Sequence, residues 1–305
     1  MTGWRGWQAD VEEMAWLAAA RRDPGAAAST EAGWHDGDRN GDARSARHLG
    51  WLSYERGDLA EALKAFERGD RRGDPECTSR LGWMLSARGD HKGAEKAFRR
   101  AAAAWRRADE RGDAEGANKI GDLLFADDDL PGALAAWRRA DRRGSAFAAR
   151  SIGHHLSGQR ARDDAMPHDE AGAEKAFRRA DDRGDAFGAL MVGHAFLRKG
   201  DLAAARSAFE RATDRGDDQA PFALSNVLEK LGDLDGAESA LRLWVRRREP
   251  LASLELRSPL HDLAQFLERR GDLDGAEATL RQAVGHEAPS AVFMLKEFLR
   301  RHHRE

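Results

Sequence analysis

The chain has 305 residues, of which 34% are charged, and its formal net charge is −3. This balance argues against a nucleic-acid-binding protein, which usually carries a basic surface. The single cysteine, Cys77, excludes a disulfide framework and a zinc site built from several thiolates.

The N-terminal residues and the hydropathy give no sign of export or of membrane insertion. Met1 to Glu13 contains acidic residues and no apolar core, unlike a signal peptide. No apolar run approaches the length of a membrane-spanning helix. We therefore expect a cytoplasmic protein without membrane contact. The bias toward Ala, Arg, Asp, Gly and Leu is typical of a GC-rich bacterial genome.

A short motif, an apolar residue followed by a small one, recurs along the chain. From Gly50 to Ala264 the small residues are separated by 32, 39, 32, 40, 32 and 39 residues. A period of this size is typical of stacked-repeat proteins. The motif occurs at Leu49-Gly50, Leu81-Gly82, Ile120-Gly121, Ile152-Gly153, Val192-Gly193, Leu224-Ser225 and Leu263-Ala264.

Each copy of the motif predicts two short helices. Apolar residues at offsets −1, +2 and +3 from the small residue share one face of the first helix. Gly-Asp pairs, such as Gly57-Asp58 within a copy and Gly73-Asp74 between copies, are typical helix stop and start signals. An earlier copy of the motif lies at Leu17-Ala18, 32 residues before Gly50, so we predict one domain, 1–305, with eight helix-turn-helix units and a capping helix. The units lie near 11–42, 43–74, 75–113, 114–145, 146–185, 186–217, 218–256 and 257–288, and the cap at 289–303.

These residues resemble those of the tetratricopeptide repeats and their Sel-one-like relatives. The matching positions are Leu49-Gly50, Gly57, Ala62, Phe66 and a small residue three further on, as at Ala140, Ala180 and Ala212. The resemblance covers about residues 11 to 290. It implies an all-α, right-handed superhelical solenoid whose concave inner surface binds peptides or partner proteins.

Three insertions interrupt the 32-residue spacing. Seven extra residues between Phe98 and Gly112 amount to about two helical turns, so we predict a longer second helix there. Eight extra residues fall in the turn from Gly158 to Gly172, where a longer connection indicates either a functional loop or tolerated drift. Seven more lie near Arg248 to Pro259 and predict a change in the angle of the superhelix.

One face of the first helices is not needed for packing within a pair, at offsets −3, +1 and +4 from the small residue. By the family resemblance this is the concave surface. Aromatic residues beside Arg and Asn on such a face indicate an interface hot spot, although a tight superhelix would instead pack them against the next unit. The candidate peptide-binding residues are Arg47, Trp51, Tyr54, Trp83, Asn118, Asp122, Phe125, Arg150, His154, His194 and Asn226.

The sequence contains no clear signal for catalysis or for a cofactor. His154 and His194 occupy equivalent positions in neighbouring units, with His155 and His168 nearby, but zinc requires three or four convergent ligands. The glycines follow the repeat and form no phosphate-binding loop, and no Ser or Cys has a His partner in a local motif. We therefore predict no enzyme, no metal and no cofactor.

These observations predict a non-enzymatic scaffold or adaptor that binds a protein or peptide through its concave face. Three alternatives stay open: a receptor for a signalling peptide, a nucleic-acid-binding helical repeat and a self-assembling structural protein. Steep salt dependence of binding would identify the second, because phosphate contacts release counterions. A groove filled by another copy of the chain would identify the third. The sequence does not define the oligomeric state.

Overall fold

The computed structural model describes residues 24–158, 169–248, 259–286 and 290–304. Every regular element in these ranges is an α-helix, so the predicted all-α class is confirmed. The helices are α2 (Pro24–Arg39), α3 (Ala43–Glu55), α4 (Leu59–Arg71), α5 (Pro75–Ala87), α6 (His91–Glu110), α7 (Ala114–Ala126), α8 (Leu130–Arg142), α9 (Ala146–Leu156), α10 (Glu170–Asp182), α11 (Ala186–Arg198), α12 (Leu202–Asp214), α13 (Ala220–Leu231), α14 (Leu234–Arg248), α15 (Pro259–Arg270), α16 (Leu273–Gly285) and α17 (Ala291–Arg301).

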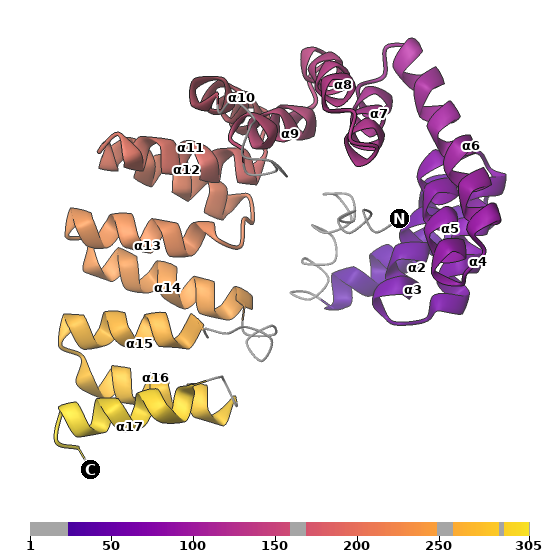
Figure 1. Ribbon diagram of the computed structural model, residues 1–305. Coiled ribbons are helices and arrows are strands. Elements are labelled where there is room, and N and C mark those ends of the chain that lie inside the picture. The colour runs from indigo at the N-terminus through magenta and orange to yellow at the C-terminus, as the bar shows by residue number, and fades with distance from the viewer. Residues whose placement is uncertain (1–23, 159–168, 249–258, 287–289, 305) are drawn as a thin grey trace. The chain divides into compact units, whose positions relative to one another are not determined.

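The chain divides into two compact units, Met1–Ala148 and Ala149–Glu305 (Figure 1). Helices α2 to α8 lie in the first unit, α10 to α17 lie in the second, and the division falls early in α9. Consecutive helices in each unit pack as helix-turn-helix pairs, such as α3 with α4 and α11 with α12. Helices α3, α5, α7, α9 and α11 each begin at the first residue of a predicted repeat. The single domain and the right-handed course of the whole chain stay predictions.

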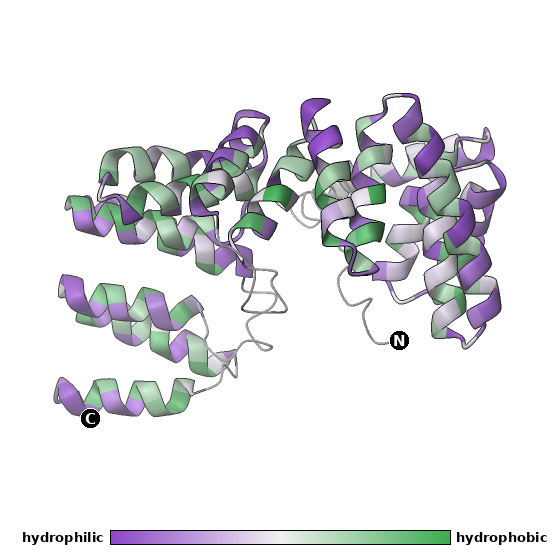
Figure 2. Ribbon diagram, turned by 45° about the horizontal axis from the view of Figure 1, so that its top comes forward, coloured by the Kyte–Doolittle hydropathy of each residue, from purple (hydrophilic) through white to green (hydrophobic). Residues whose placement is uncertain are grey.

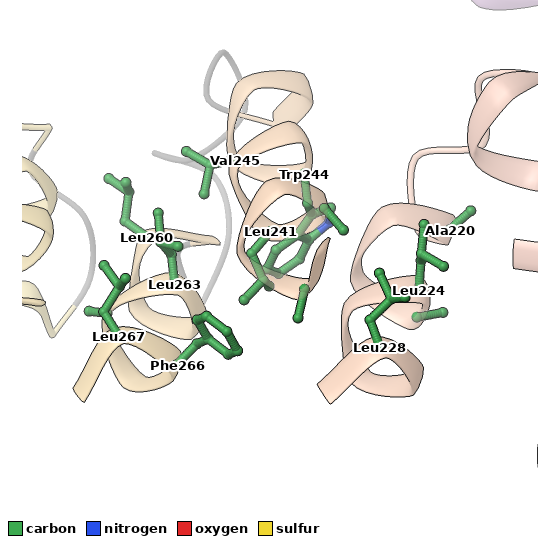
Figure 3. Close-up of a cluster of buried hydrophobic side chains, with 14 of the residues drawn as sticks. Ala220, Leu224, Leu228, Leu241, Trp244, Val245, Leu260, Leu263, Phe266 and Leu267 are labelled. Carbon is green, nitrogen blue, oxygen red and sulfur yellow. The ribbon is translucent and has the colours of Figure 1, made fainter. Parts of the chain in front are cut away.

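The helices are amphipathic, and each buries its apolar side against its neighbours. Figure 2 shows hydrophobic and hydrophilic residues alternating along most of them. In the second unit, Figure 3 shows Leu241 and Trp244 of α14 between Leu224 of α13 and Phe266 of α15. A second helix therefore shares its core with the helix before it and the helix after it, as expected of a stacked repeat.

The Gly-Asp pairs end one helix and begin the next, as the sequence predicts. At the junction between α10 and α11, Gly184 adopts a φ of +91°, which L side chains rarely take. Asp185 then accepts a hydrogen bond from the backbone N–H of Gly188 at 2.6 Å and so caps α11. This arrangement supplies an acceptor for an N–H group that would otherwise lack a helical partner.

The small residue of the recurring motif lies beneath an aromatic ring of the second helix. A Cβ atom added to Gly193 would lie 2.5 Å from a ring carbon of Phe209, which is fully buried. The same relation holds between Gly121 and Trp137. Glycine is therefore required by the close approach of the two helices, not by its backbone flexibility.

Two repeats carry a different pair of residues at these positions. Where Gly193 and Phe209 stand in one repeat, the next two have Ser225 with Leu241 and Ala264 with Leu280, at the same separation of 16 residues. A larger residue on the first helix thus accompanies a smaller one on the second. The total volume at the contact is partly conserved, which is how cores tolerate substitution.

The predicted longer second helix is confirmed. Helix α6 has 20 residues, whereas α4 and α8 have 13. Trp105, in the added turns, is 3% exposed and packs with Ala101, Ile120 and Ala136. Helix α6 is therefore longer than α4 and α8 (Figure 1), and the added turns keep their apolar side buried.

The other two insertions fall largely outside the described residues. Residues 159–168 of the 158–172 turn, which include His168, and residues 249–258 lie outside the described ranges. The predicted capping helix is confirmed as α17, whose Ala291 and Phe298 are each 1% exposed. Its Phe293 is 70% exposed, so one side of α17 packs on the stack and another faces solvent.

Successive second helices are also joined by a ladder of ion pairs. An Asp near the end of one second helix pairs with arginines 30 and 34 residues later. In the second unit, Asp181 of α10 accepts hydrogen bonds from Arg211 and Arg215, each at 2.6 Å. In the first unit, Asp109 of α6 receives the equivalent pair from Arg139 and Arg143. The ladder fixes the register between neighbouring repeats.

Titration of this ladder predicts a loss of stability in acid. Burial alone would raise the pKa of Asp181, but the hydrogen bonds from Arg211 and Arg215 outweigh it, and the pKa lies below the ordinary value of 3.8. The ionised carboxylate therefore stabilises the fold above that pH, and the contribution disappears as the pH falls through the lowered pKa.

We expect Asp181→Asn to lower the free energy of unfolding by about 1–2 kcal/mol at pH 7. The difference from the wild type should shrink below about pH 4, where the wild-type carboxyl also becomes neutral. Urea denaturation followed by circular dichroism at several pH values measures this. Asp182→Asn, at the exposed neighbouring position, is the control and should change little. An Asp181→Asn difference that is constant from pH 7 to acid would contradict the assignment.

Candidate functional site

The predicted site residues at the start of the chain lie on α3. Tyr54 is 48% exposed, whereas Trp51 is only 7% exposed. The Trp51 ring meets the rings of Tyr54 and Phe66 edge-on, with centroids 6.0 Å apart in each case. The guanidinium carbon of Arg80, from α5, lies 4.2 Å from the Trp51 ring centroid. Trp51 is therefore a core residue that supports Tyr54 and Arg80.

The corresponding residues of α5 and α7 keep part of their surface accessible. Trp83 and Phe125 are both half-buried, and Asn118 is buried. The Phe125 ring centroid lies 5.6 Å from that of Trp137. Asp122 accepts a hydrogen bond of 3.0 Å from the indole N–H of Trp137, so its carboxylate is held by the second helix of its own repeat.

The two arginines of the predicted face form ion pairs within the protein. Arg47 of α3 lies 3.7 Å from Asp74, and Arg150 of α9 lies 3.1 Å from Asp185. Asp74 and Asp185 cap the N-termini of the first helices that follow, α5 and α11. These arginines therefore connect a first helix to the cap of the next.

The remaining predicted residues lie in the second unit and are not brought together into one cluster. The imidazole of His154 stacks on Phe187 at 4.6 Å, and that of His194 meets Phe209 edge-on at 5.1 Å. Burial, with a smaller effect of Arg198, lowers the pKa of His194 below its ordinary value, so the ring is neutral at pH 7. Asn226 is exposed.

Neither a metal centre nor a reactive thiol stands out in the part of the chain that the structure describes. Within it, no group of three or more His, Cys, Asp or Glu side chains could hold a metal ion. Cys77 is fully buried, and burial raises the pKa of its thiol. Buried thiols of this kind are inert, so Cys77 is a packing residue.

A buried charge cluster joins α3, α5 and α7, and the sequence analysis did not anticipate it. Glu76, in the first turn of α5, is 1% exposed. The nearest side-chain nitrogens of Arg80 and Lys119 lie 2.9 and 3.0 Å from its oxygens. Burial alone would raise the pKa of Glu76, but the charges of Lys119, Arg80 and Arg47 outweigh it, and the pKa is lowered. Glu76 is therefore an anion in the interior.

The cluster was missed because Glu76, Arg80 and Lys119 lie outside the offsets assigned to packing or to binding, and Arg47 was assigned only to binding. Arg80 and Lys119 both stand two residues before the small residue of the motif, at Gly82 and Gly121. A cation at the same position in two successive repeats, with an acid four residues before the first of them, is the signal that could have revealed it. The cluster links the first helices of three repeats.

Comparison with known proteins gives two kinds of match. Two family models described as tetratricopeptide repeat match residues 76–108 and 190–252, one in each unit. No curated protein matches the sequence. Both matched segments contain the helix pairs described above.

Solved structures resemble the chain in fold. One is c5321, a protective antigen of uropathogenic Escherichia coli with an SLR fold, at 19% identity and a TM-score of 0.53, covering 87% of this chain and 58% of that one. Another is yeast Tom70, at 12% identity and a TM-score of 0.56, covering 92% of this chain and 62% of that one. The chain thus spans less than two thirds of either relative, and these likenesses concern the fold alone.

These findings define the general class of the protein. Repeats of this family generally mediate protein–protein interaction and are typically not catalytic. None of the described helices has both the length and the apolar character needed to cross a membrane. Two segments of the chain thus match the tetratricopeptide repeat, and the helix pairs in the rest of the described chain have the same helical-repeat fold.

Proposed function

We propose that the protein is a non-enzymatic cytoplasmic scaffold that binds a protein or peptide through one side of α3, α5 and α7. We call this side the first-helix face and define it by Tyr54, Trp83 and Phe125. The observation that carries the proposal is the partial exposure of these three aromatic rings on successive first helices. Aromatic side chains of this kind dominate the energetics of protein interfaces.

The surroundings of the first-helix face suit a rigid binding surface. Trp51 packs against Tyr54, and the charge cluster of Glu76 links the three helices. Asp122 adds a fixed carboxylate near Phe125. A surface that is already ordered loses little conformational entropy when a partner binds.

We expect the double variant Tyr54→Ala/Trp83→Ala to weaken partner binding by about 30-fold or more, because even one truncation at a hot spot costs on the order of 2 kcal/mol. The measurement is affinity capture from a bacterial lysate with quantitative mass spectrometry, followed by titration of the captured partner. Phe293→Ala removes a 70% exposed aromatic ring from α17 and is the matched control.

The proposal fails if the folded double variant binds the partner as the wild type does. Binding that weakens steeply with added salt and is insensitive to the aromatic substitutions would instead indicate nucleic acid. Recovery of a second copy of the chain as the only occupant would indicate self-assembly.

A further inference from the structure

A pocket of about 410 Å³ lies in the first unit, away from the first-helix face. Its walls come from the beginnings of α3, α5 and α7 and from the C-terminal half of α6. Trp105, which is 3% exposed, supplies apolar lining. None of Tyr54, Trp83 and Phe125 lines it. Its volume suits a few side chains of a ligand.

The insertion in α6 builds one wall of this pocket. Trp105, Arg107 and Arg111 all lie beyond the length of an ordinary second helix, which has 13 residues. Counted back from the glycine after the helix, Arg107 and Arg111 correspond to Arg68 and Arg72 of α4. Arg68 and Arg72 pair with Asp38, whereas the added turns of α6 place Arg107 and Arg111 at the pocket.

Three of the four acidic side chains of the pocket, Asp74, Glu76 and Asp113, have identified partners within the protein. Glu76 pairs with Arg80 and Lys119, which stand outside the lining. Asp74 faces Arg47 and caps α5 through the backbone N–H of Cys77. Asp113, likewise, caps α7 through backbone N–H groups. These negative charges are thus largely satisfied within the protein.

Three arginines of the pocket differ in this respect. Arg44, Arg107 and Arg111 are exposed, and their guanidinium groups form no ion pair with any other described residue. The lining of the pocket contains four basic and four acidic side chains. Arg80 and Lys119, which pair with Glu76 outside the lining, bring the number of basic side chains to six. The N-termini of three helices add further positive potential. The pocket is therefore ready to accept negative charge.

We propose that this pocket binds an acidic segment of a peptide, with two Asp or Glu carboxylates on Arg107, Arg111 and Arg44 and their methylene groups against Trp105. Guanidinium groups recognise carboxylates through paired hydrogen bonds. The acidic residues in the same pocket limit the negative charge that it accepts, which disfavours the dense phosphates of a nucleic acid. The inference rests on the proposed peptide-binding function and adds the chemistry of the partner.

The test uses fluorescein-labelled Gly-Ser peptides with amidated C-termini that carry two Glu residues one to four positions apart. Peptides with Gln at the same positions are the counterparts, and fluorescence anisotropy with the full chain at about 0.15 M salt measures binding. We expect at least one Glu peptide to bind about tenfold or more tightly than its Gln counterpart. We also expect Arg107→Ala/Arg111→Ala to abolish this preference.

The double variant Arg106→Ala/Arg138→Ala removes the same charge from exposed positions that do not line the pocket, and it should keep the preference. Equal losses in the two double variants would overturn the proposal in favour of non-specific attraction. The absence of a Glu preference up to about 1 mM peptide would also overturn the proposal. Tighter binding of a single-stranded oligonucleotide through the same arginines would overturn it in favour of nucleic acid.

Tyr54→Ala/Trp83→Ala separates this proposal from the function proposed above. Because its substitutions lie outside the pocket, this variant should retain the Glu preference even where it loses the captured partner. If the aromatic substitutions abolish partner binding but no variant prefers Glu peptides, the pocket proposal alone is overturned. If the chain prefers Glu peptides but the aromatic substitutions leave partner capture unchanged, only the proposal that the first-helix face binds the partner is overturned.

Discussion

Replacing Glu76 with Ala is expected to lower the free energy of unfolding by about 3–5 kcal/mol, because it leaves buried cations without a counter-charge. Arg80 and Lys119 are each only 7% exposed, so little water can replace the carboxylate. Arg47, at 9% exposure, adds a third positive charge nearby. Chemical denaturation followed by circular dichroism measures the change. Hydrogen exchange should show it concentrated in α5 and α7.

A matched variant distinguishes the buried cluster from ordinary surface ion pairs. Glu95 pairs with Arg99 on the same helix, but both side chains are more than half exposed. Glu95→Ala should therefore change the stability by less than about 0.5 kcal/mol. Adding Lys119→Met to Glu76→Ala should recover part of the loss, because it removes one of the stranded charges. Similar losses for Glu76→Ala and Glu95→Ala would refute the description of the cluster as buried and mutually dependent.

The second large effect is expected at the contact between the two helices of a repeat. Gly193→Ala should lower the free energy of unfolding by about 2–3 kcal/mol, because the new methyl group would overlap the ring of Phe209. The sign of this change in stability is informative. In a helix interior Ala is normally more stabilising than Gly by about 0.5–1 kcal/mol. Thermal and urea denaturation of the variant measure the outcome.

The chain itself contains the control and the rescue. Gly33 lies within α2 with nothing near the position of an added Cβ, so Gly33→Ala should stabilise the protein slightly. Adding Phe209→Leu to Gly193→Ala should give less destabilisation than the two changes summed, since the repeats with Ser225 or Ala264 carry Leu on the second helix. Additive losses would mean that the two positions do not share one contact.

Regular features of this fold could be predicted because they recur with the repeat. The spacing of Gly50, Gly82 and Gly121 gave the helix pairs, and the seven residues inserted before Gly112 gave the longer α6. Each of these depends on local sequence: periodic apolar residues, helix-ending glycines and capping carboxylates.

Features that depend on contacts between repeats were not predictable in the same way. Trp51 and Tyr54 share one predicted face, yet Trp51 is buried and Tyr54 is exposed, because Phe66 and Arg80 cover only the first. Arg47 was proposed to contact a ligand, but the structure pairs it with Asp74 of the next helix cap. Offsets along one helix give the direction of a side chain, whereas its exposure depends on the helix beside it.

One rung of the ladder between second helices uses backbone carbonyls in place of a carboxylate. At the position of Asp181 the following repeat has Thr213, and Arg247 donates instead to the backbone carbonyls of Thr213 and Asp217, each at 3.0 Å. A carbonyl does not take up a proton in the range where carboxylates do. Acid therefore removes the links between repeats unevenly, and the α12–α14 rung is left in place where its neighbour is discharged.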